Sequence, residues 1–176
     1  MNILLAFSPF IAFAVIERLI GPIEGLIAGA AVAAILIFRE WSAKRSPKIL
    51  EIGTFLLFAA LALYALIFGL DWPLFGVRLA VDFGLFLIVL ISMIIRKPFT
   101  VQYAKEEVPS TVWNHPEFLR KNMVITAVWA LAFAVMVVAD YILLTRPDIS
   151  RRVGIIATIA ALVGAFKFTN WYPSRN

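Results

Sequence analysis

The sequence predicts an all-α, polytopic transmembrane bundle of about six helices, with five as the alternative, plus a short interfacial helix on the cytoplasmic side. Three observations predict this fold class. Hydrophobic residues fill 62% of the 176 positions and charged residues only 15%, whereas a soluble globular chain is close to half apolar and a quarter charged. The mean hydropathy is +0.94. Long apolar stretches recur along the whole chain, and a bilayer accepts apolar surface that no soluble core of this size could bury.

Six apolar stretches are the expected membrane helices, and together they make residues 1–176 a single transmembrane domain. They lie at residues 3–20, 23–38, 49–70, 74–95, 123–144 and 153–170. About 20 helical residues cross a hydrocarbon core of about 30 Å, so the third, fourth and fifth stretches are long enough. The second is short, and the first and sixth are marginal. None has the in–out alternation of a barrel strand.

The first stretch does not have the pattern of a cleaved signal peptide. It lacks a basic start, and Glu17-Arg18 ends its apolar run. Gly21-Pro22 then breaks the chain, and proline suits the first turn of a new helix. We therefore expect a tight helical hairpin over residues 1–38. In the alternative, the first stretch lies flat in the interface and five spans remain.

Basic residues predict the orientation. Eleven of the 16 lysines and arginines, including every lysine, fall in the loops 39–48 and 96–122 or near the C-terminus. Such residues favour the cytoplasmic side, so we place both loops and both termini in the cytoplasm. The net charge of +5 then indicates contact with lipid rather than with nucleic acid. No cysteine is present, which excludes disulfides and thiolate metal sites.

Small residues recur every four positions in the second stretch, at Gly25, Gly29 and Ala33. They share one helix face and would let another helix approach closely. We expect internal packing on this face, with a homodimer contact as the alternative.

Charged residues gather near the non-cytoplasmic ends of the stretches. Those that form the candidate intramembrane ion-pair or pathway set are Glu17, Arg18, Glu24, Arg78, Asp82 and Asp140. Charges inside an apolar run are costly unless they are paired or reach water. The set predicts an ion-pair lattice between helices; the alternatives are a polar pathway open to the outside and snorkelling at the interface.

The loop 96–122 holds the longest polar sequence. Two prolines bracket a short expected helix at 98–108, in which Phe99 and Tyr103 share a face. We expect it to lie on the cytoplasmic leaflet, where Phe99, Tyr103, Lys105 and Trp113 form a candidate partner surface.

The next helix is expected to start near Pro116. Asn114 or His115 would cap it and Glu117 would complete a capping box. His115 is the only histidine, so no metal or cofactor site is expected. Glu51 is expected to favour the dipole at a helix start. Enzyme motifs are missing, and we expect no catalytic residues.

Several short motifs resemble the bacterial septation protein A family, also called inner membrane-spanning proteins of the YciB type. They are Phe7-Ser8-Pro9-Phe10 with Phe13, the small-residue helix, the basic loop, Lys97-Pro98, Asn122, and Trp129-Ala130 with Phe133. The loop after Lys97-Pro98 is longer than in that family. The run from Phe99 to Glu106 also resembles a signature of uncharacterised bacterial membrane proteins.

The resemblance implies a small inner membrane protein linked to cell division and envelope synthesis, without catalytic residues. We therefore expect a structural or interaction protein whose partners are the lipid bilayer, other envelope or division proteins, or a second copy of the chain. The alternative is a small transporter or channel-like protein with an outward-facing polar cavity built on the charged set.

Overall fold

A computed structural model describes residues 3–69, 72–146 and 148–174, and these are mostly helical with no strand among them. The all-α prediction is thus confirmed. Contacts group the chain into two compact units, Met1–Val77 and Arg78–Asn176. Helix α5 (Leu74–Ile94) begins in the first unit and continues into the second. A single domain over residues 1–176 stays a prediction.

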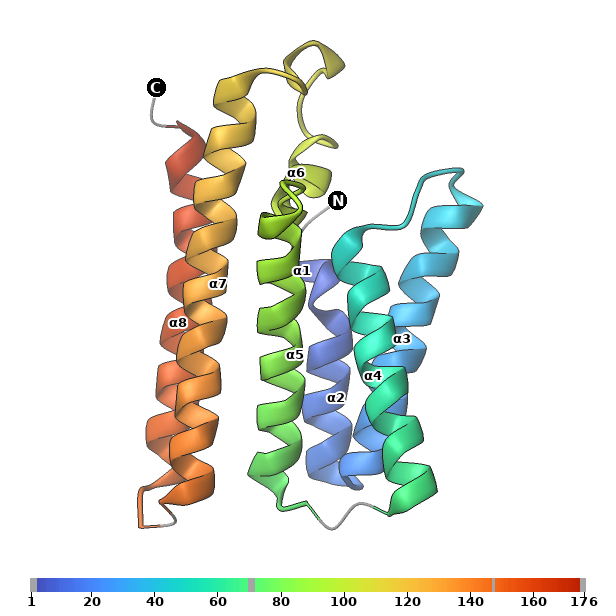
Figure 1. Cartoon of the computed structure of the whole chain (residues 1–176), viewed down its shortest axis with the longest axis vertical. Coiled ribbons are helices and arrows are strands. Elements are labelled where there is room, and N and C mark those ends of the chain that lie inside the picture. Colours follow the sequence, from blue (N-terminus) through green and yellow to red (C-terminus); the bar gives the residue numbers. More distant parts are fainter. Residues whose placement is uncertain (1–2, 70–71, 147, 175–176) are drawn as a thin grey trace. The chain divides into compact units, whose positions relative to one another are not determined.

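The first unit contains α1 (Ile3–Ala6), α2 (Ser8–Leu19), α3 (Pro22–Ser42) and α4 (Ile49–Phe68). Gly21 separates α2 from α3, and Pro22 opens α3 as expected. Figure 1 shows α2 and α3 as antiparallel neighbours, with α4 beside α3, so the predicted hairpin is confirmed. The predicted third stretch ended at Leu70, which lies outside the described residues.

The small-residue face of α3 lies at the centre of this packing. A Cβ atom added to Gly25 would lie 2.9 Å from Glu17 Cβ of α2, and one added to Gly29 would lie 2.9 Å from the ring of Phe58 of α4. Ala33, one turn later, is fully buried. Only very small residues allow backbones to approach this closely. Phe58 is itself fully buried within α4, so its ring has no open space into which to move.

The second unit contains the remaining elements. They are most of α5, then α6 (Phe99–Ala104), η1 (Ser110–Val112), α7 (Pro116–Thr145), α8 (Arg151–Trp171) and η2 (Tyr172–Ser174). Helices α7 and α8 run side by side (Figure 1). Leu143 of α7 meets Gly154 of α8, and Trp129 Nε1 donates to Thr169 Oγ1 at 2.9 Å.

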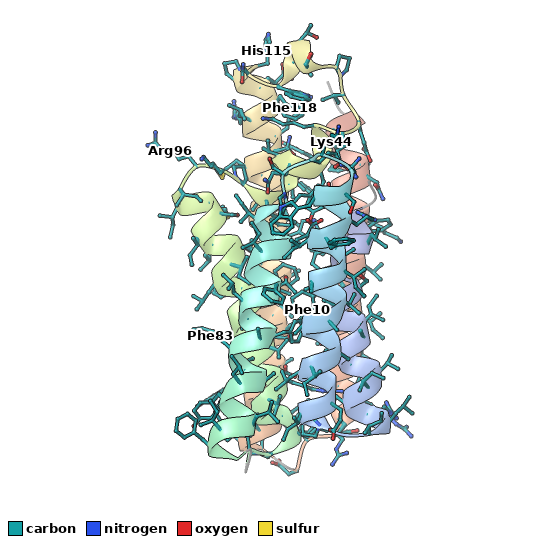
Figure 2. The ribbon with its side chains drawn as sticks, turned by 90° about the vertical axis from the view of Figure 1, so that its right-hand side faces the viewer. Phe10, Lys44, Phe83, Arg96, His115 and Phe118 are labelled. Carbon is teal, nitrogen blue, oxygen red and sulfur yellow. The ribbon has the colours of Figure 1, made fainter. Side chains whose placement is uncertain are left out.

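Helix α7 begins at Pro116, as the sequence predicted (His115, just before it, is labelled in Figure 2). The predicted cap is wrong, because no side chain hydrogen-bonds the backbone at this helix start. Proline has no N–H, which leaves fewer donors for a cap to satisfy.

Within the described residues, five helices are long and apolar enough to cross a bilayer, namely α3, α4, α5, α7 and α8. The chain is therefore a multi-pass membrane protein. The first stretch differs from the six-span expectation because it is split at Phe7 into α1 and α2. The 12 residues of α2 extend about 18 Å, well short of a hydrocarbon core of about 30 Å. The five-span alternative placed this stretch flat in the interface, whereas α2 lies antiparallel to α3. The choice between six and five spans stays a prediction.

The C-terminal end of α3 closes in a left-handed turn. The Arg45 N–H donates to the Glu40 carbonyl and the Lys44 N–H to the Trp41 carbonyl, both at 2.9 Å. Lys44 has φ 55°. This is the Schellman arrangement, in which glycine usually takes the left-handed position.

Helix α5 ends in the same arrangement. The Lys97 N–H donates to the Ser92 carbonyl and the Arg96 N–H to the Met93 carbonyl, both at 2.9 Å. Arg96 has φ 56°, and Figure 2 labels both left-handed residues at their turns. For a non-glycine residue, this left-handed backbone conformation raises the free energy of the folded state by about 1–2 kcal/mol. Lys44 and Arg96 are the two non-glycine residues with positive φ in the described part of the chain.

Candidate functional site

A buried cluster of charges joins the end of α3 to the start of α4. Glu40 is fully buried and contacts three cations. Its carboxylate accepts from Arg39 Nη2 at 2.9 Å, from Arg45 Nε at 2.8 Å and from Arg45 Nη2 at 3.1 Å. Lys48 Nζ lies 3.2 Å from Glu40 Oε2 and 3.8 Å from Glu51 Oε1. The cluster thus contains two carboxylates and three cations, and Lys48 lies between the two carboxylates.

Local backbone structure places each member of this cluster. The left-handed turn at Lys44 reverses the chain, so that Arg45 returns toward Glu40 in the last turn of α3. Lys48 stands immediately before α4, and Glu51 Oε2 accepts from the Lys48 backbone N–H at 3.1 Å. This is the reciprocal part of a capping box, so Glu51 does more than favour the helix dipole.

The cluster stabilises the helix connection through pairing, because a buried charge without partners is very costly. Arg45 binds the Glu40 carboxylate with two donors, the strong form of such a pair. Burying an ion pair adds little net stability, whereas removing one partner is strongly destabilising. The Glu40 cluster (Arg39, Glu40, Arg45, Lys48 and Glu51) therefore specifies how α3 and α4 are joined.

The predicted ion-pair set lies elsewhere. In the first unit Glu17 is buried against Gly25, whereas Arg18 and Glu24 are exposed. In the second unit Arg78 and Asp82 lie one helical turn apart on α5 and are half-buried. Asp140 is buried on α7. The lattice between these residues stays a prediction, and the Glu40 cluster includes none of them.

The candidate partner surface divides into a buried part and an exposed part. Phe99 and Tyr103 are buried, with ring centroids 6.2 Å apart in an edge contact. Lys105 and Trp113 stay partly exposed, and Lys105 Nζ lies 5.1 Å from the centre of the Trp113 ring. The expected surface helix is thus corrected: α6 has only six residues and its aromatic face is covered.

Helix α6 is anchored to α7 by hydroxyl groups that the sequence analysis missed. Thr100 Oγ1 donates to the Asn122 carbonyl at 3.0 Å and lies 2.8 Å from Thr126 Oγ1. Ser92 Oγ accepts from the Phe99 N–H at 3.3 Å, which ties the start of α6 to the end of α5. These partners lie up to 26 residues apart, so no local pattern pointed to them.

Sequence analysis also missed Glu40 and the pairing role of Lys48. One signal was available, since Glu40 is the single acid in the basic loop 39–48.

The described residues contain no group of three or more histidines, cysteines, aspartates or glutamates that could hold a metal ion. No protein-family profile, curated protein or solved structure matches the chain.

Proposed function

We propose that this chain is a structural or interaction protein of the bacterial inner membrane that serves cell division or envelope maintenance. The observation that carries the proposal is that key polar and small residues of the first unit contact other residues of the same unit. The charge of Glu40 is neutralised by the cations of its own cluster. The space beside Gly25 is filled by α2, and the space beside Gly29 is filled by α4. Both features favour a rigid helical support over a transport site, because their polar and small groups already have partners within the unit.

The proposed topology places the loops 39–48 and 96–122 in the cytoplasm, on the distribution of basic residues. The surface offered to partners is then the exposed part of the second loop, where Lys105 lies over Trp113. Tryptophan is enriched in protein contacts that dominate binding energy. The resemblance to the septation protein A family supports division or envelope proteins as the partners.

A genetic complementation experiment tests this proposal. The gene would be deleted in the source bacterium and cell length and septum spacing measured. Wild-type protein should restore both, and the double variant Lys105→Ala, Trp113→Ala should fail at the same membrane level. Glu24→Gln, an exposed change at the other end of α3, should restore both. Normal division in the deletion strain would disprove the septation role.

A small transporter or channel is the second candidate. Asp140, buried on α7, favours it, because an acidic side chain within an apolar helix marks an ion pathway in many membrane proteins. Helix α7 has 30 residues, about 45 Å of length, and Asp140 lies little more than one turn before its end. This position near the interface also suits a structural pair.

Proteoliposomes separate the two candidates. A pH-sensitive dye inside the vesicles would report proton entry under an imposed gradient, and ion-selective dyes would report cation entry. If the protein is structural, vesicles that contain it should show the same flux as empty vesicles. Flux through wild-type protein that Asp82→Asn or Asp140→Asn abolishes, with thermal unfolding unchanged, would establish the transporter instead.

A further inference from the structure

Two helix ends in this chain place a basic residue where the backbone favours glycine. Lys44 after α3 and Arg96 after α5 each take the left-handed position of the closing turn, at φ 55° and 56°. Glycine or asparagine adopts this conformation with less strain. Each turn thus has a cation in a backbone conformation that is unfavourable for it, which suggests that the charged side chain has a role of its own.

At the end of α3, the helix dipole does not explain this choice. A cation near a helix C-terminus is favourable, but it can stand in the last helical turn without a positive φ. Arg39 already does so in α3. The favourable interaction with the dipole of α3 is therefore no reason for Lys44 to occupy the strained position.

At the end of α3 the cations lie next to a lipid-facing surface. Phe38 and Trp41 are 69% and 65% exposed in the last two turns, as expected for aromatic residues at the membrane interface. Lys44 is exposed directly beyond them, and the Arg45 side chain remains 51% exposed although it contacts Glu40. This end carries the basic residues Arg39, Lys44, Arg45 and Lys48 against the acidic Glu40 and Glu51. The surplus of charge at this end is positive.

The end of α5 repeats this arrangement. Ile94 and Ile95 are 78% and 51% exposed immediately before the turn. Arg96 and Lys97 follow, both exposed (Arg96 is labelled in Figure 2). No acidic residue occurs in the sequence from Arg96 to Lys105. Here too an exposed apolar band ends directly at a pair of cations.

We propose that each of these two turns binds the headgroup of an anionic phospholipid, with Lys44 and Arg96 contacting the phosphate. The exposed apolar side chains before each turn would contact the acyl chains, which a free phosphate ion lacks. Arg45 and Lys97, the next residues, add a second cation at each turn. The Glu40 cluster holds the first of these turns in shape without neutralising Lys44.

Native mass spectrometry of the full-length protein tests this inference. Delipidated protein in a neutral detergent would be titrated with phosphatidylglycerol and, separately, with phosphatidylcholine. We expect two tightly bound phosphatidylglycerol molecules per chain and weaker binding of phosphatidylcholine. Lys44→Gly and Arg96→Gly should each weaken one site about fivefold, the effect of one basic residue at an anionic membrane surface. Glycine suits both turns, so these variants should fold.

Matched variants make the result decisive. Lys44→Arg should bind both lipids as tightly as wild type, and Lys44→Asn should weaken one site about fivefold, as Lys44→Gly does. Arg120→Gln, an equal change of charge at an exposed position of α7, should retain both. The inference is overturned if Lys44→Gly and Arg96→Gly bind like wild type, if Arg120→Gln loses as much, if phosphatidylcholine binds equally, or if millimolar inorganic phosphate displaces the lipid.

Discussion

Arg45 contacts Glu40 twice, through its backbone and through its side chain. Its N–H donates to the Glu40 carbonyl at 2.9 Å, and its guanidinium Nε donates to the Glu40 carboxylate at 2.8 Å. One residue thus closes α3 and neutralises the acid in its last turn. The chain reverses and the buried charge is paired in the same step, so the shape of the turn and the charge pairing depend on each other.

Glu40→Gln should destabilise the protein by about 3 kcal/mol, the low end for breaking a buried pair, because Arg39 and Arg45 are half-exposed and water can solvate them in part. Thermal unfolding in a mild detergent would measure the effect. Glu24→Gln, on the exposed part of the same helix, should change stability by less than about 0.5 kcal/mol. Equal stabilities of the two variants would show that the Glu40 cluster has no structural role.

Gly29→Ala should destabilise the first unit by about 1–3 kcal/mol, because the added methyl group would meet the buried ring of Phe58 at 2.9 Å. Phe58→Leu should recover part of the loss when it is combined with Gly29→Ala. Gly164→Ala in α8 is the matched control. Its added Cβ meets nothing within 4 Å, so helix propensity should raise stability by up to about 1 kcal/mol. The same direction of change at both glycines would contradict the packing described here.

Much of this packing could be predicted from the sequence because it follows from local patterns. Apolar length indicates α4, α5 and α7, the four-residue spacing of Gly25 and Gly29 indicates a close helix contact, and Pro116 marks a helix start. Each signal lies within one segment and has a direct physical cause. The structure agrees with the sequence at these places for that reason.

The parts that could not be predicted depend on partners distant in sequence. The spacing of Phe99 and Tyr103 shows that they share a face, but not that this face is covered. The bonds of Thr100 to α7 bridge 22 and 26 residues, and nothing in either segment points to the other. Glu40 stood out only as an acid among basic residues, a pattern that equally fits an exposed loop.

Lys44→Gly should raise the free energy of unfolding by about 1 kcal/mol in neutral detergent, because glycine relieves the left-handed strain at φ 55°. Arg96→Gly should behave in the same way at its own turn. Lys44→Ala removes the charge but keeps the strain, so it should stay near wild type. A gain from Lys44→Ala as large as that from Lys44→Gly would mean that charge repulsion, rather than backbone strain, limits stability at this turn.

Thr100→Val should loosen α6 from α7 and destabilise the protein by about 1–2 kcal/mol, because it leaves the buried Thr126 hydroxyl without the partner it has at 2.8 Å. The double variant Thr100→Val, Thr126→Val removes both hydroxyls, so its cost should be clearly smaller than the sum of the single changes. Hydrogen exchange at the α6 amides, combined with thermal unfolding, would measure both effects. Thr145→Val, at an exposed hydroxyl near the end of α7, should leave the exchange of α6 unchanged. Strict additivity of the Thr100 and Thr126 changes would show that the hydroxyl pair does not hold α6 in place.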